Sequence, residues 1–161
     1  EEIERRCELD LDQVTYAIGG LETYRWEFYQ SPQRLRHFRE KAYRTFLNDY
    51  RNERRARYMP GCLPALPFRD GQFDLTLVSY LLLVYEDQFS YEFHKESLRE
   101  IMRVTCGEAR LYPIVNFEAK RCSYLDRLRA DRDFAHLRFE EVQTDFEFLL
   151  NSNYYLRVLR R

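Results

Sequence analysis

A strand, a helix and a second strand are predicted in succession between residues 66 and 114. The β-rich apolar run Phe73–Ser79 follows an Arg-Asp-Gly turn signal, and its nearly continuous apolar character predicts a strand buried on both faces. A helical pattern from about Tyr91 to Val104 comes next, and a second apolar run occupies Glu108–Ile114. A helix connecting two such runs predicts a crossover between parallel strands.

The carboxyl ends of these two strands are where a ligand is expected. Open parallel sheets bind ligands beyond the carboxyl ends of their strands, so the positions just after Leu77 and just after Ile114 are expected to matter most. The connection Tyr80–Phe93 is rich in tyrosine, phenylalanine and acidic residues, which is typical of a functional loop. Gly107 is expected to end the preceding helix as a carboxyl-cap glycine.

The amino-terminal part is predicted to be mainly helical. A weak helical pattern covers Glu1–Ile18, and a strong amphipathic one begins with Ser31 as its cap and runs from Pro32 to about Arg54. The aromatic segment Tyr24–Tyr29 between them is interpreted as core packing, with a ligand-facing wall as the alternative. The expected apolar stripe of the second helix is Leu35, Phe38, Ala42, Thr45, Phe46 and Tyr50.

The rest of the chain is predicted to form the sheet. Arg57–Cys62 is expected to be a short strand, and a further helix is expected to begin at Ser123 as its cap. Alternating patterns over residues 138–148 and 154–159 predict a terminal antiparallel hairpin. The expectation is therefore an α/β fold with a mostly parallel sheet flanked by helices and completed by that hairpin.

The chain length favours one domain. With 161 residues and 45% hydrophobic content, the chain is long enough to build one core. Within that single domain, residues 1–56 are expected to be a mainly helical segment and residues 57–161 the sheet-forming segment.

The charge balance argues against a polyanion partner. Lys and Arg number 26 against 27 Asp and Glu, which leaves a net charge of -1 and no global basic field. The arginines between Arg34 and Arg57 are interleaved with Glu40, Asp49 and Glu53, so a solvated helix face is preferred to a nucleic-acid patch. Neither nucleic acid nor a membrane is expected as a partner.

The sequence also favours a cytoplasmic protein without a metal site. The longest apolar run, Leu75–Tyr85, is shorter than the roughly 18 residues of a membrane span, and the charged start Glu1–Arg6 is not a signal peptide. The four cysteines are far apart in the chain, so reduced thiols are expected rather than disulfides or zinc ligands.

Common catalytic motifs are absent from the sequence. It contains no Gly-x-Ser-x-Gly elbow, no His-Glu-x-x-His pair and no phosphate-binding glycine loop after a strand. Hydrolase functions are therefore not supported, and residue patterns alone predict only an α/β domain with a ligand face near Ser79.

A resemblance to a known family adds to this. The run Leu66–Ser79, the helix segment Leu98–Val104 and the strand Ala109–Leu111 resemble the class I S-adenosylmethionine-dependent methyltransferases of the type 11 group. The run from Gly61 to Phe68, with its two Leu-Pro pairs, and Arg110-Leu111-Tyr112-Pro113 are similar to an uncharacterised bacterial branch of that superfamily. The resemblance implies a Rossmann-like fold, S-adenosylmethionine as cofactor and methyl transfer to a small-molecule or unknown acceptor.

The resemblance also implies positions for the cofactor. It places Cys62 and Leu63 beside the adenine, and Ser79, Tyr80 and Leu81 under the methionine moiety. Cys62 departs from the family pattern, which usually has an acidic residue there, and a thiol is a weaker acceptor for the adenine amino group. Such chemistry depends on proximity and needs no fixed catalytic side chain, but His94, Tyr85 and Glu86 are candidates if the acceptor must lose a proton.

The glycine-rich strand and loop of the superfamily have no counterpart in the sequence. The chain is therefore expected to be the carboxyl-terminal portion of a methyltransferase, or a truncated copy, that lacks the amino-terminal strands of the full fold. The alternative is a non-catalytic interaction or scaffold module, whose partner chain supplies the missing half.

Overall fold

The chain divides into two compact units. The computed structural model describes residues 2–161, apart from the side chains of Tyr16 and residues 53–56. One unit extends to Pro60 and the second comprises Gly61–Arg161. This boundary lies four residues after the predicted change from helical to sheet-forming sequence.

The first unit is a pair of helices. Helix α1 spans Glu2–Gly19 and helix α2 spans Pro32–Arg57, and the two pack against each other. Ser31 caps α2 as predicted, because its hydroxyl oxygen accepts a hydrogen bond from the Arg34 amide at 3.2 Å. The buried apolar residues of this unit are Leu11, Ile18, Leu35 and Leu47.

The predicted apolar stripe of α2 is only partly correct. Leu35 is buried, but Phe38, Ala42 and Thr45 are exposed, and Leu47 is buried in their place. Leu35 and Leu47, twelve positions apart, are buried because α2 packs against a single neighbouring helix. This one contact covers fewer residues of α2 than the predicted wide apolar stripe contains.

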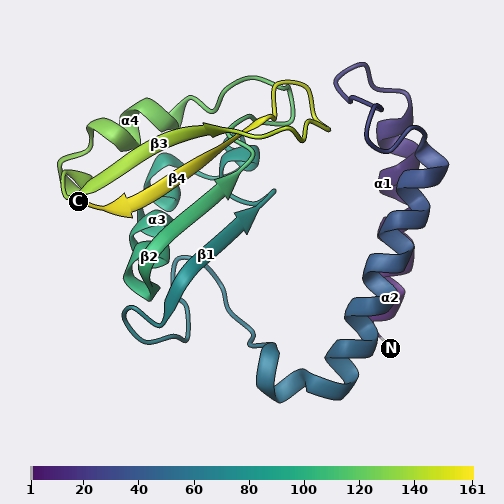
Figure 1. Ribbon diagram of the computed structural model, residues 1–161, viewed down its shortest axis with the longest axis horizontal. Coiled ribbons are helices and arrows are strands. Elements are labelled where there is room, and N and C mark those ends of the chain that lie inside the picture. Colours follow the sequence, from purple (N-terminus) through teal and green to yellow (C-terminus); the bar gives the residue numbers. More distant parts are fainter. Residues whose placement is uncertain (1) are drawn as a thin grey trace. The chain divides into compact units, whose positions relative to one another are not determined.

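The second unit is built on a four-stranded mixed sheet. Its strands are β1 (Phe73–Ser79), β2 (Thr105–Tyr112), β3 (Leu137–Gln143) and β4 (Tyr154–Arg160), in the spatial order β1-β2-β4-β3. Strands β1 and β2 are parallel, whereas β4 is antiparallel to both of its neighbours. Three strands therefore run in one direction and β4 runs in the other, as the arrows in Figure 1 show. The predicted α/β class and terminal antiparallel hairpin are confirmed, but the predicted mostly parallel sheet is wrong. Among the described strands, only β1 and β2 pair in parallel, because the reversed strand β4 lies between β2 and β3.

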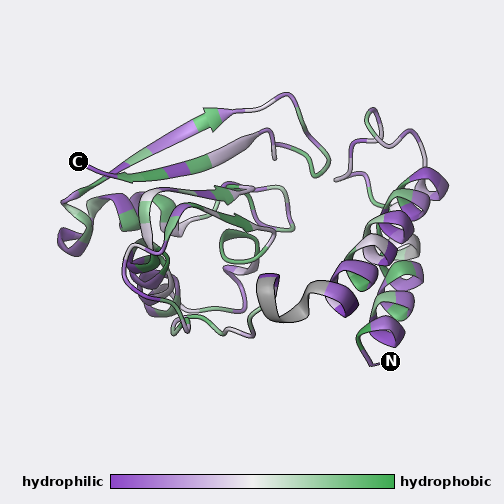
Figure 2. Cartoon of the chain, turned by 60° about the horizontal axis from the view of Figure 1, so that its bottom comes forward, coloured by the Kyte–Doolittle hydropathy of each residue, from purple (hydrophilic) through white to green (hydrophobic). Residues whose placement is uncertain are grey.

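Helices cover one face of this sheet. Helix α3 (Tyr91–Val104) crosses over between β1 and β2, and helix α4 (Tyr124–Ala130) lies between β2 and β3 in the chain (Figure 1). Short 3-10 turns occur at Leu83–Tyr85 and Arg132–Phe134. The core joins apolar side chains of both helices to alternate residues of the strands, and the strands accordingly alternate in hydropathy in Figure 2. Its most buried members include Leu98, Ile101, Leu125, Leu137, Leu156 and Val158.

The crossover unit agrees closely with the prediction at β1 and α3, but Gly107 does not end the helix. Helix α3 stops at Val104, and β2 begins directly at Thr105, so that Gly107 lies within the strand. A Cβ at Gly107 would lie 2.1 Å from the Asp74 carbonyl oxygen of β1. Glycine is required there by the close approach of two backbones.

The predicted burial of β1 on both faces is wrong. Leu75 is 43% exposed and Leu77 is 67% exposed, while Thr76 and Val78 point toward the helix-covered side. The described helices α3 and α4 cover only one face of the sheet, which leaves the face that carries Leu75 and Leu77 open within this unit. We call this second surface the open face.

Two further local predictions are corrected. Residues 57–62 do not form a strand, because α2 continues to Arg57 and Cys62 makes only an isolated bridge with Ala65. Ser123 precedes α4 but does not cap it, because its hydroxyl donates to the Glu86 carboxylate at 2.9 Å instead.

Candidate functional site at the carboxyl edge of the sheet

The carboxyl ends of β1 and β2 lie side by side. Ser79 and Tyr112 are register partners at the last position of each strand. One residue further on, the Tyr80 amide donates to the Tyr112 carbonyl oxygen at 2.7 Å, and the two tyrosine rings contact edge to face with centroids 5.6 Å apart. Tyr80 adopts a positive φ of 49°, a conformation that few non-glycine residues take. The chain thus turns sharply at the position where a ligand is expected.

Glu86 ties together the loops that follow the two strands. Its carboxylate accepts hydrogen bonds from the Asn116 side-chain amide at 2.7 Å and from the Ser123 backbone amide at 2.7 Å. Burial opposes ionisation, but the hydrogen bonds from Ser123, Cys122 and Asn116 outweigh it and hold the pKa of Glu86 below its usual range. A carboxylate with a lowered pKa and this many donors is a poor general base.

His94 is buried among backbone carbonyls and aromatic rings. Only 1% of the residue is exposed, Nδ1 lies 2.9 Å from the Ser90 carbonyl oxygen and Nε2 lies 3.0 Å from the Leu82 carbonyl oxygen. The Tyr124 ring packs on it with centroids 5.0 Å apart. This imidazole holds the 80–90 connection against α3 and is closed off from solvent.

Tyr85, the third predicted candidate for a base, lies on a partly buried aromatic surface. Its ring contacts Phe117 at 5.0 Å and Phe89 at 6.1 Å between centroids. Among the residues that the structure describes, its hydroxyl has no hydrogen-bond partner, in contrast to Glu86 and His94.

The five residues assigned to the cofactor lie in two segments of the second unit. Ser79, the last residue of β1, and Leu81, two positions further on, are both exposed. Cys62 is exposed, and its thiol donates to the Leu63 carbonyl oxygen at 3.4 Å. Leu63 packs against the same apolar core that holds Val78, the neighbour of Ser79. One core therefore supports both segments.

A shallow hollow on the open face adjoins Ser79, and the sequence reasoning missed it. It has a volume of about 280 Å³. Leu75, Leu77 and Ser79 alternate along β1 and therefore share one side of the strand, which is the signal that could have indicated this surface. The prediction that β1 is buried on both faces hid this signal. The hollow is lined by Leu77, Val78, Ser79, Arg110, Tyr112, Thr144, Phe146 and Tyr155.

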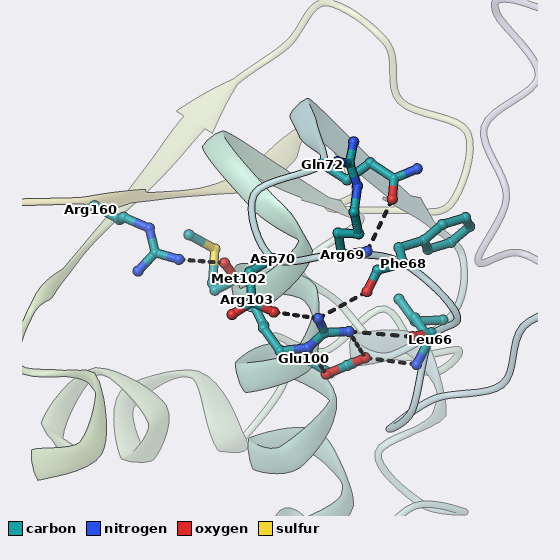
Figure 3. A network of polar contacts seen from close by, with 9 residues as sticks. All are labelled: Leu66, Phe68, Arg69, Asp70, Gln72, Glu100, Met102, Arg103 and Arg160. Atoms are coloured by element: carbon teal, nitrogen blue, oxygen red, sulfur yellow. Dashed lines mark hydrogen bonds and ion pairs between the residues drawn. The ribbon is translucent and has the colours of Figure 1, made fainter.

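The motif that carries the family resemblance forms a structural clamp at the opposite end of β1. In Figure 3, the Arg103 guanidinium donates to the carbonyl oxygens of Phe68 and Leu66. It also pairs with Asp70 at 2.6 Å and with Glu100 at 2.7 Å. Glu100 in turn accepts from the Leu66 amide at 2.7 Å. The hydrogen bond from Arg103 and that from the Leu66 amide lower the pKa of Glu100, although burial opposes them. These residues fix the loop before β1 and do not reach the carboxyl edge.

The arginines of α2 are largely paired with acidic groups. Arg36 contacts Asp12, and Arg51 contacts Glu4 of the neighbouring helix. Arg44 and Arg57 pair with Glu40 and Asp49. The side chains of Arg54 and Arg55 lie outside the described residues. The described arginines therefore form a solvated, charge-balanced face.

The remaining features concern metal ions, membranes and thiol chemistry. Among the side chains that the structure describes, no cluster of three or more His, Cys, Asp or Glu could hold a metal ion. None of the described helices is long and apolar enough to cross a membrane. Burial raises the pKa of the Cys122 thiol to about 12, which makes this cysteine unreactive.

Comparison with known proteins identifies a relative of unknown activity. No protein-family model matches the chain. The chain is 32% identical over 163 residues to the uncharacterized protein MJ0045 of Methanocaldococcus jannaschii, and the match covers 100% of this chain and 70% of that protein. The chain therefore belongs to the same family as the uncharacterized protein MJ0045.

Proposed function

We propose that the chain provides one half of a class I S-adenosylmethionine-dependent methyltransferase, and that the complete protein transfers a methyl group to a small-molecule acceptor. The proposal is supported chiefly by the carboxyl edge of the sheet. There β1 and β2 run parallel and end together at Ser79 and Tyr112. The crossover helix α3 agrees with the Rossmann-like fold that the resemblance implies, and the reversed strand β4 belongs to the terminal hairpin predicted from the alternating pattern.

The residues that would hold the cofactor are those named by the resemblance. Ser79, Tyr80 and Leu81 would support the methionine moiety, and Cys62 and Leu63 the adenine. The exposed hydroxyl of Ser79 and the apolar side chain of Leu81 suit a ligand with both polar and apolar parts, whereas the Cys62 thiol is a weak polar partner. S-adenosylmethionine would supply the methyl group from its sulfonium centre.

The chain's own residues would contribute mainly position. Methyl transfer is accelerated by holding the acceptor in line with the methyl group, which requires rigid walls rather than a fixed base. Glu86 and His94 stabilise the loops of this edge through their hydrogen bonds. Tyr85 remains the candidate base, because its hydroxyl has no hydrogen-bond partner among the described residues.

A non-catalytic interaction module is a second candidate. The observation that favours it is the open face of the sheet, where Leu75 and Leu77 are exposed on an edge strand. An edge strand without Lys or Pro invites pairing with a further strand. Under this alternative the edge of β1 would be occupied by a partner chain, and the carboxyl edge would bind no cofactor.

Calorimetric titration with S-adenosylhomocysteine tests the proposal. Because the sequence contains no glycine-rich phosphate or cofactor loop, we expect weak binding by this chain alone, with a dissociation constant on the order of 1 mM. Leu81→Glu should abolish this binding. Leu75→Glu is the matched control, because Leu75 and Leu81 are both 43% exposed and Leu75 lies away from the carboxyl edge.

Three outcomes would contradict the proposal in different ways. Absence of binding by the unmodified chain would favour the interaction module. Equal loss in both variants would place the site elsewhere. A micromolar dissociation constant for the chain alone would show that this chain contains the complete cofactor site, and not one half of it.

A further inference from the structure

The hollow on the open face has the position and size of a small-ligand site. It lies at the carboxyl ends of β1 and β2 and extends over Tyr155 of β4 to the β3–β4 loop. Its volume of about 280 Å³ is close to the lower limit of typical ligand pockets, which fits one small ring. Of the five residues assigned to the cofactor, Ser79 lines the hollow and the other four do not.

Three aromatic side chains form its walls. The rings of Tyr112 and Phe146 lie with centroids 6.2 Å apart, and Tyr155 lines the β4 side. The Tyr112 hydroxyl is within 3.1 Å of the buried Ser152 hydroxyl, which fixes the ring. Held in place, these rings offer both faces and edges to a planar aromatic ligand.

One cation lies beside these rings. The guanidinium carbon of Arg110 is 5.5 Å from the centroid of the Tyr155 ring. Arg110 uses Nε and Nη2 to bind the Glu108 carboxylate. Among the described residues, Arg110 Nη1 has no hydrogen-bond partner. Arg110 lines the hollow, and a guanidinium donor suits a carboxylate oxygen.

A ladder of ion pairs crosses the open face and reaches the hollow. Glu108 is shared between Arg110 and Arg157, and Glu140 is shared between Arg157 and Arg138. Three guanidinium groups thus share two carboxylates, and Arg110 is the member of this ladder that lines the hollow.

We propose that the hollow binds a small aromatic carboxylate. The ring packs among Tyr112, Phe146 and Tyr155, and the carboxylate accepts a hydrogen bond from Arg110 Nη1. This binding is inferred from the geometry of the hollow alone. Only the further step, that such a ligand is the methyl acceptor, rests on the proposed function.

An amide-shift titration of the isotope-labelled chain with benzoate tests this inference without any cofactor. Benzoate should shift the signals of residues in the hollow, among them Ser79, Arg110 and Thr144. Cyclohexanecarboxylate retains the charge but not the aromatic ring, and benzyl alcohol retains the ring but not the charge. Both should bind more weakly than benzoate.

Arg110→Gln should weaken benzoate binding about tenfold, which corresponds to the loss of one charge-assisted hydrogen bond. Arg138→Gln is the matched control, because Arg138 belongs to the same ladder but lies on β3 outside the hollow, and it should leave the affinity unchanged. The amide spectrum of each variant also reports whether its fold is retained.

The inference is overturned if benzoate shifts no signal of the hollow, if Arg110→Gln binds benzoate as well as the unmodified chain, or if benzyl alcohol binds as tightly as benzoate. Benzoate binding without any binding of S-adenosylhomocysteine would support the site and contradict the proposed function. The opposite result would support the proposed function and remove this site.

Discussion

At the scale of single residues, polar side chains with many partners stabilise the connections of the second unit. The sequence suggests Glu86 and His94 as catalytic groups, because carboxylate and imidazole side chains can both exchange protons. The structure gives Glu86 donors from two loops and places both nitrogens of His94 against backbone carbonyls. Sequence could name these residues, but their partners are distant in the chain and follow only from the folded loops.

Asp131 is predicted to make stability depend on acid pH. Its side chain is 15% exposed and accepts from the Asp133 amide at 3.0 Å, from Lys95 at 2.9 Å and from the Tyr91 hydroxyl at 2.8 Å. These hydrogen bonds lower the pKa of Asp131 to about 2. Because the folded-state pKa lies below that of the unfolded chain, this stabilisation is complete above pH ~4 and is lost as the pH falls toward 2.

Urea unfolding of Asp131→Asn at several pH values checks this expectation. The variant should be less stable than the unmodified chain at pH 6, and the difference should shrink as the pH falls to about 2. Asp87→Asn, at an exposed position, serves as the control and should change little at either pH. A destabilisation by Asp131→Asn that stays constant over this range would contradict the role assigned to the charge.

At the scale of elements, the contact between β1 and β2 depends on the absence of a side chain at Gly107. A Cβ there would lie 2.1 Å from the Asp74 carbonyl oxygen and 3.1 Å from its carbonyl carbon. Gly107→Ala must therefore push the backbones of the two strands apart, and we expect it to lower the free energy of unfolding by about 3 kcal/mol.

Urea unfolding followed through the amide signals of β2 measures this effect. Gly20→Ala is the matched control, because a Cβ at Gly20 has no atom within 4 Å, and its effect should remain within about 1 kcal/mol. If Gly107→Ala were as stable as the unmodified chain, the two strands would not approach each other as closely as described.

The elements that were predicted well are those with local signals. Strand β1 follows a turn and α3 has a wide apolar face, so their boundaries agree with the prediction. The start of β2 was predicted three residues late, because Gly107 was interpreted as a helix terminator. A glycine is needed at position 107 because the backbone of Asp74 in β1, more than 30 positions earlier, approaches it closely. A contact between residues so far apart leaves no local signal in the sequence.

At the scale of the whole molecule, the candidate site depends on how the sheet of the second unit is assembled. The sheet has one face packed against α3 and α4 and one open face that carries Leu77 and the ion-pair ladder. The sequence predicted an edge for a ligand after Leu77, and the structure places Ser79 and Tyr112 together there. The hollow could not be predicted, because its walls come from three strands and a loop that only the sheet order brings together.

The central claim is that the carboxyl edge of β1 and β2 is a binding site for S-adenosylmethionine. The most direct test is the map of amide shifts when S-adenosylhomocysteine is added to the isotope-labelled chain. We predict changes concentrated at Ser79–Leu81 and at Cys62–Leu63. Changes confined to the helical unit or to the Glu100–Arg103 clamp, or no changes at millimolar ligand, would contradict the claim.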